Sequence, residues 1–139
     1  MSNSKNLLIS SAMIAGLGLM AVLAAEAPAP APKHTIKEVM GAIHKAPTNA
    51  PAGTQTIVVK AKAGKASKAE IDTMVEYYTA LPLNKPPGGD DASWKSKTEA
   101  LIAAAISLQK SETNAVQKIN DAANCKACHS IHKTATKAQ

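Results

Sequence analysis

The 139-residue sequence predicts an all-α protein in which several helices form one bundle. Apolar residues recur every three or four positions in four segments, a spacing that places them on one face of a helix. Stretches rich in Pro and Gly separate the first three segments. The β-branched run at residues 56–59 favours a strand by propensity alone, but no second strand pattern is present to pair with it. Four amphipathic helices that each bury one face predict a bundle.

Residues 1–25 have the layout of a secretory signal peptide. Lys5 stands in a short polar start, residues 7–23 are largely apolar, and Ala24 and Ala25 provide the small residues of a cleavage site. The apolar stretch is at the short end of what spans a bilayer, so an uncleaved anchor remains the alternative. We expect a periplasmic or otherwise exported protein that contacts the membrane only if this segment is retained.

Residues 26–33 form a linker in which Ala and Pro alternate, and such a sequence is extended and semi-rigid. Residues 34–139 then form the single folded domain. Its first helix is predicted from Thr35 and Glu38, which have the spacing of a capping box. This helix should end at Ala46 and Pro47. Its apolar face carries Ile36, Val39, Met40 and Ile43.

Ser67 and Glu70 repeat the capping-box spacing and predict the second helix, which Pro82 interrupts. Its apolar positions are Ile71, Met74, Val75, Tyr78 and Leu81. After the breaker residues 84–89, either Asp90 or Asp91 can cap the third helix. Its apolar positions are Trp94, Leu101, Ile102, Ala105 and Leu108.

The fourth helix is predicted to begin at a cap formed by Ser111 or Thr113. Its apolar positions are Val116, Ile119, Ala122 and Ala123. The same helix is expected to continue into the cysteine-containing segment that follows, because the three- and four-residue spacing continues there.

Cys125-Lys126-Ala127-Cys128-His129 is a C-x-x-C-H motif. On one turn of helix, positions i, i+3 and i+4 share a face. Two thiols can then bond the edge of a porphyrin while the imidazole reaches its iron, so the motif predicts one covalently attached haem c. Cys125 and Cys128 would form the thioethers, and His129 would be the axial iron ligand.

Two alternatives remain open for this motif. A redox-active or structural disulfide is one, although such C-x-x-C motifs usually follow a strand in a βαβ unit. A zinc site formed by both cysteines, His129 and His132 is the other, although four ligands on eight residues of one helix cannot easily surround a tetrahedral ion.

Composition agrees with a bound cofactor. Phe is absent and the chain has one Trp and two Tyr, so the side chains supply little bulky apolar area, which a haem could replace. We expect the haem-free chain to be poorly folded. All 16 basic residues are Lys, and losing Lys5 with the leader leaves 15 against 10 acidic residues. Such a modest excess does not predict nucleic-acid binding, whereas an acidic protein partner fits it.

Met40 is the candidate for the second axial iron ligand. It lies on the predicted buried face of the first helix, and its thioether suits iron. Packing in the core is the alternative for this residue. His44 lies one turn after Met40, so an axial ligand is one alternative for it, but a surface position near the haem edge is favoured. His34 is expected at the surface, and His132 in contact with solvent or a haem propionate. Trp94 and Tyr78 are expected in the core.

A C-terminal haem motif after several helices, here Ala123-Asn124-Cys125-Lys126-Ala127-Cys128-His129-Ser130, resembles the class II cytochromes c, the cytochrome c-prime group. The resemblance covers residues 35–133 and implies an antiparallel four-helix bundle. Some members have five-coordinate iron that binds gases, and others use a Met from the first helix and are low-spin electron carriers. Lys37-Glu38-Val39-Met40 is similar to the second kind.

The resemblance therefore implies a monohaem carrier of single electrons that serves redox partner proteins and is not an enzyme. A protein that binds NO or CO at five-coordinate iron is the alternative. Many relatives pair, which implies a homodimer as an open alternative. The chain departs from the family in its short first helix and in having no Arg, which many gas-binding members place near the haem.

Overall fold

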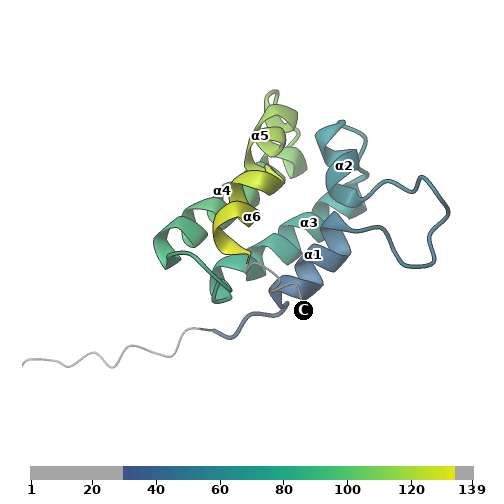
Figure 1. Cartoon of the computed structure of the whole chain (residues 1–139). Helices are drawn as coiled ribbons and strands as arrows, with labels where there is room; N and C mark the ends of the chain where they lie inside the picture. The colour runs from purple at the N-terminus through teal and green to yellow at the C-terminus, as the bar shows by residue number, and fades with distance from the viewer. Residues whose placement is uncertain (1–29, 134–139) are drawn as a thin grey trace, which may run out of the picture.

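The computed structural model describes residues 30–133, so the predicted signal peptide and the start of the linker lie outside the described residues. Within that range the chain forms six α-helices and one short 3-10 helix, with no strand, which confirms the all-α prediction (Figure 1). The helices are α1 Ile36–His44, α2 Ile57–Lys62, α3 Lys68–Ala80, η1 Leu81–Leu83, α4 Asp91–Gln109, α5 Ala115–Ala122 and α6 Cys125–His132.

Helix α1 begins at the predicted capping box. The Thr35 hydroxyl accepts a hydrogen bond from the Glu38 N–H at 3.2 Å, and the Thr35 N–H donates to the Glu38 carboxylate at 2.7 Å. Val39 and Ile43 are fully buried. The helix ends at His44, because Lys45 is already extended ahead of Pro47.

The β-branched run at residues 56–59 forms helix α2, a segment additional to the four that were predicted. Thr56 caps it by accepting a hydrogen bond from the Val59 N–H, and Val58 and Ala61 bury its inner face. Gly64 follows with a φ of 68°, a backbone conformation that ends the helix and that glycine adopts without strain. Packing and a local cap thus outweigh the β-propensity of Ile and Val.

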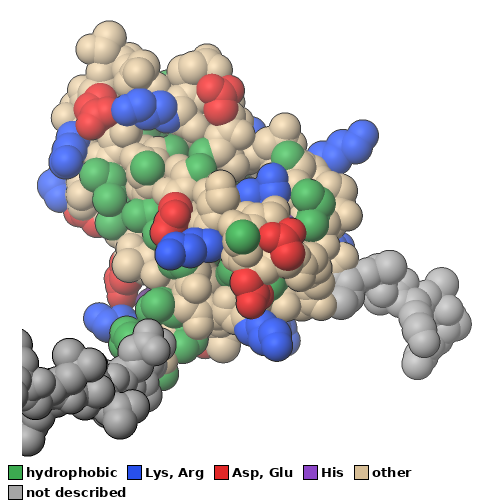
Figure 2. Space-filling model, turned by 90° about the vertical axis from the view of Figure 1, so that its left-hand side faces the viewer, with side chains coloured by type: hydrophobic (Ala, Val, Ile, Leu, Met, Phe, Trp, Pro, Cys, Tyr) green, Lys and Arg blue, Asp and Glu red, His purple; other side chains and the backbone are tan. Residues whose placement is uncertain are grey.

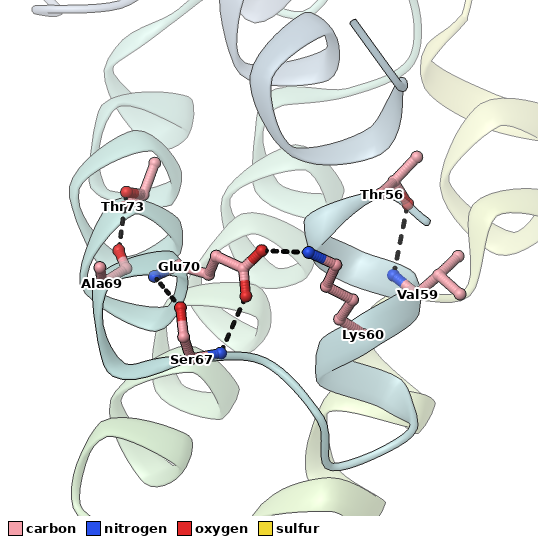
Figure 3. A network of polar contacts seen from close by, with 7 residues as sticks. All are labelled: Thr56, Val59, Lys60, Ser67, Ala69, Glu70 and Thr73. Carbon is pink, nitrogen blue, oxygen red and sulfur yellow. Dashed lines mark hydrogen bonds and ion pairs between the residues drawn. The ribbon is translucent and has the colours of Figure 1, made fainter. Parts of the chain in front are cut away.

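Helix α3 is fixed to α2 by a polar network at its N-terminus (Figure 3). Ser67 and Glu70 form the predicted capping box, with the Ser67 N–H donating to Glu70 at 2.8 Å. The other carboxylate oxygen of Glu70 accepts from the Lys60 ammonium of α2 at 2.6 Å. One carboxylate therefore both caps α3 and connects two helices.

Pro82 ends α3 as predicted, and the chain continues through η1 into residues 84–90. Asp90, the first of the two candidate caps, accepts a hydrogen bond from the Ser93 N–H at 2.7 Å and starts α4. The indole N–H of Trp94 donates to the Leu81 carbonyl at 3.1 Å, which fixes α4 against η1. Helix α4 packs along both α3 and α5.

The prediction of one continuous last helix is wrong, because this part of the chain forms two helices, α5 and α6. Ala123 leaves the helical conformation, and Asn124 caps α6 by accepting a hydrogen bond from the Ala127 N–H at 3.1 Å. Neither Ser111 nor Thr113 caps α5, which begins after Asn114. Ser111 instead has a φ of 54° in the turn after α4.

The hydrophobic core lies among α1, α3, α4 and α5. Tyr78 and Trp94 belong to it, as predicted, although Trp94 also reaches a surface hollow described below. The largest fully buried side chains in the core are Val39, Ile43, Met74, Tyr78, Leu81 and Ile119, and the polar Thr98 and His132 are also fully buried. On the face shown in Figure 2, Lys and acidic side chains alternate with small apolar patches. No helix between residues 30 and 133 is long and apolar enough to cross a membrane.

Candidate functional site

The C-x-x-C-H motif forms the first turns of α6, with both cysteines as free thiols. Cys125 and His129 are exposed and Cys128 is half-buried. Helix α6 packs closely along no other helix of the described chain, and His132 is its one buried residue. The motif therefore lies on a helix with few close contacts to other helices, although Cys128 packs against the edge of the core. Helix α6 is the yellow helix in Figure 1.

A first hollow of about 220 Å³ lies between the N-terminal half of α6 and the C-terminal end of α1. Cys125, Cys128 and His129 line it from α6, and Met40 and His44 line it from α1. The remaining lining residues are Lys45, Leu101, Ala122, Ala123 and Asn124, so its walls are largely apolar.

A second hollow of about 230 Å³ lies between the C-terminal half of α6 and the N-terminal end of α1. Its lining residues are Ile36, Met40, Lys45, Pro87, Trp94, Cys128, His129, His132 and Lys133. Met40 and His129 line both hollows, as do Cys128 and Lys45. The two hollows are therefore neighbours that share Met40, Lys45, Cys128 and His129 as common walls.

The structure brings the predicted ligand Met40 to the same space as the haem motif, although they are far apart in the sequence. Met40 is half-buried and packs against the edge of the core, on the same face of α1 as Val39 and Ile43. Met74 lies fully buried on α3 and lines neither hollow. Of the two methionines in the described residues, Met40 is thus the one that borders the site.

His44 was expected at the surface, and this expectation is wrong. Its ring is half-buried in the wall of the first hollow, and its Nε2 lies 3.1 Å from the Tyr78 hydroxyl. Burial lowers the pKa of His44 to about 4, with smaller contributions from His129 and Lys62. Burial likewise raises the pKa of Tyr78. Its position one turn after Met40, which made an axial ligand the alternative prediction for His44, is the signal that pointed to this site.

His132 was expected to contact solvent or a propionate, and this expectation is wrong for solvent. The side chain is 2% exposed. Its Nδ1 lies 2.9 Å from the Gly88 carbonyl oxygen, and its Nε2 lies 3.1 Å from the Ser93 hydroxyl. The ring also meets Trp94 edge to face, with centroids 5.4 Å apart. Its partners lie about forty positions earlier in the chain, so no local pattern identified them.

His34, the other expected surface histidine, is also only part-exposed. Its ring stacks on Tyr77 with centroids 3.9 Å apart, and its Nε2 lies 3.3 Å from a Glu76 carboxylate oxygen. These contacts hold the segment before α1 against α3. His34 lines neither hollow, so it is not part of the candidate site.

The geometry of α6 opposes the zinc alternative. Both ring nitrogens of His132 already have protein partners, the Gly88 carbonyl and the Ser93 hydroxyl, so neither is free to bind a metal in this arrangement. In residues 30–133, no three His, Cys, Asp or Glu side chains converge as metal ligands would. Burial raises the pKa of Cys128, against a smaller opposing effect of Lys97, so this thiol is not activated.

Comparison with protein-family models, curated proteins and solved structures finds no match to this chain.

Proposed function

We propose that the protein is a monohaem c-type cytochrome that carries single electrons in an exported redox chain. The observation that carries this proposal is that Met40 and His129 border both hollows. A haem held between Met40 and His129 would need apolar space beside both residues. The two hollows that these residues share provide largely apolar space there, which supports the proposal.

The donor set on α6 fits the group chemically. Cys125 and Cys128 are free thiols one helical turn apart, and His129 follows on the same face. In this proposal the cysteines hold the porphyrin by thioethers, His129 is one axial ligand and Met40 the other. The fold would be a four-helix bundle formed by α1, α3, α4 and the α5–α6 arm, with α2 as a short addition.

The bound haem supplies an iron that alternates between Fe(III) and Fe(II). The chain's own residues set the conditions for that change. The thioether of Met40 favours the reduced state, and apolar side chains such as Leu101 and Trp94 exclude water from the hollows. No residue of the site is required to bind or transform a substrate, so electron transfer is the activity that the site supports.

The charges around the site favour an acidic redox partner. Lys45 borders both hollows and Lys133 borders the second, whereas none of the carboxylates in the described residues lines either one. Lys126 is exposed on α6 between the two cysteines. These positive charges around the hollows would attract a partner with an acidic surface and would accelerate its association at low ionic strength.

Haem attachment is tested on the protein purified after export. We expect a red protein whose polypeptide mass includes one intact haem, and a pyridine haemochrome spectrum typical of two thioether links. Replacing both Cys125 and Cys128 by Ser should remove the covalent haem, because no other cysteine is present. A colourless wild-type protein whose two thiols react with an alkylating reagent would contradict the proposal.

A five-coordinate haem protein that binds NO or CO is the second candidate, because the half-buried His44 places a polar group in the first hollow, where a small ligand would lie. Replacement of Met40 by Leu distinguishes the two functions. If Met40 ligates iron, this variant loses the ferric methionine-to-iron charge-transfer band, has a lower reduction potential and binds CO more readily.

Met74→Leu is the matched control for Met40→Leu. Both are volume-conserving substitutions that cost less than about 1.5 kcal/mol in a core, but Met74 lies away from the hollows. We expect Met74→Leu to keep the band. A wild-type ferrous protein that is already high-spin and binds CO without displacing a ligand would favour the five-coordinate alternative.

A further inference from the structure

Helix α6 is connected to the rest of the molecule mainly at its two ends. Just before its N-terminus, the Lys62 ammonium of α2 donates to the Ala123 carbonyl at 3.3 Å. Asn120 of α5 donates to the Lys62 carbonyl at 3.0 Å, so α2 holds the end of α5 from which α6 continues. Between its ends, α6 carries Cys125, Cys128 and His129, none of which is buried. At its C-terminus, the buried His132 is the one strong attachment.

The two hydrogen-bond partners of His132 determine which of its ring nitrogens carries the hydrogen. The Gly88 carbonyl can only accept, so Nδ1 carries the hydrogen of that 2.9 Å bond. In the neutral ring Nε2 is then free to accept from the Ser93 hydroxyl at 3.1 Å. Because Gly88 belongs to the loop before α4 and Ser93 to its first turn, one side chain joins α6 to two other parts of the fold.

The loop is shaped to receive this ring. A Cβ atom added to Gly89 would lie 2.6 Å from the His132 Nδ1 and 2.8 Å from Ile131 Cγ2. Gly89 also has a φ of 77°, which side chains with a Cβ rarely adopt. The absence of a side chain at Gly89 therefore allows His132 to reach the Gly88 carbonyl.

We propose that His132 is a positioning residue for the iron site, an inference that rests on the proposed haem function. His132 holds the C-terminal end of α6 on α4 and on the loop at residues 84–90. In doing so it fixes how far α6 stands from α1, one helical turn beyond His129. That separation determines whether His129 and Met40 can both reach one iron, so loss of the His132 contacts should weaken the bond to Met40.

The test uses the intact haem-bearing protein and three readouts. His132→Phe keeps an aromatic ring against Trp94 but removes both hydrogen bonds. Gly89→Ala displaces the His132 ring while leaving the sequence of α6 unchanged. Gly53→Ala is the matched control, because Gly53 also has a positive φ, 84°, but an added Cβ there meets nothing within 4 Å. Thermal unfolding reports stability, and the ferric methionine-to-iron band and the reduction potential report the site.

If the inference is right, His132→Phe and Gly89→Ala both weaken the methionine-to-iron band and lower the reduction potential, since methionine ligation raises it. Gly53→Ala lowers the melting temperature because of the positive φ at this position, but it leaves the methionine-to-iron band and the reduction potential unchanged. If all three variants lower only the melting temperature, His132 is merely structural and the inference is overturned. A colourless wild-type protein would instead overturn the proposed function, so the two failures are distinct.

Discussion

Ser111 has a φ of 54° in the turn that joins α4 to α5. This left-handed conformation brings the Cβ of an ordinary residue close to the following carbonyl. Asn and Asp reduce that cost through local hydrogen bonds, but the Ser111 side chain forms none within the described part of the chain. Ser111 is exposed, so its backbone strain is not compensated by burial.

We therefore expect Ser111→Gly to stabilise the protein by about 0.5–1 kcal/mol, the net of relieved strain and the greater flexibility of glycine in the unfolded chain. Chemical denaturation of the purified protein measures this difference. Thr113→Gly, an exposed position in the same turn without a positive φ, should lower stability by a similar amount. Equal losses for both variants would show that the strain at Ser111 is negligible.

At the scale of single residues, local contacts were predictable and distant ones were not. Thr35, Ser67 and Asp90 bond to the backbone three residues later. The sequence alone therefore identified the caps Thr35 and Ser67 and left the third cap between Asp90 and Asp91. His44 and His132 contact residues more than thirty positions away, and their burial follows from packing. The sequence therefore predicted His44 and His132 at the surface, whereas their hydrogen bonds connect separate helices.

At the scale of elements, Glu70 makes the start of α3 sensitive to pH. Its hydrogen bond with Lys60 lowers the pKa of this carboxyl, and the Ser67 N–H adds to the effect. A carboxyl whose folded-state pKa lies below its unfolded value of 4.5 stabilises the fold above that pH. The contribution is lost as pH falls below about 4.5 and Glu70 takes up a proton.

Glu70→Gln should therefore be less stable than the wild type at pH 7 by about 1 kcal/mol, the usual value of a helix cap. The difference should shrink as pH falls below 4.5, because the wild-type carboxylate is then neutralised. Denaturation midpoints across this range test the expectation. Glu99→Gln is the control, because Glu99 is exposed, its distance to Lys95 is 3.9 Å, and such pairs contribute little. A constant difference at all pH values would exclude Glu70 as the titrating group.

The sequence identified some helices correctly and missed or merged others. Capping boxes and three- to four-residue spacing identified α1, α3 and α4 because those signals are local. Helix α2 was missed because Ile57, Val58 and Val59 favour strands, and only burial of Val58 and Ala61 decides otherwise. The division between α5 and α6 had a signal in Asn124, a favourable N-cap residue, which the continuing apolar spacing obscured.

At the scale of the whole molecule, the sequence predicted the fold class but not the two hollows between α1 and α6. The C-x-x-C-H motif identified Cys125, Cys128 and His129 as a group, and helix amphipathicity identified Met40 as the candidate opposite them. Their common border with two hollows depends on how α1 and α6 are placed by the rest of the bundle. That placement depends on long-range contacts such as that of His132, which sequence spacing does not reveal.

The separate cap at Asn124 makes α6 a unit that can open without unwinding α5. Helix α6 buries little apart from His132, and segments with few buried contacts open at the lowest free-energy cost. The contacts among α1, α2, α3, α4 and α5 do not depend on this opening, so Cys125 and Cys128 would gain exposure while those helices stay in place. Under the proposed haem function, the same opening would expose both thiols to an incoming porphyrin.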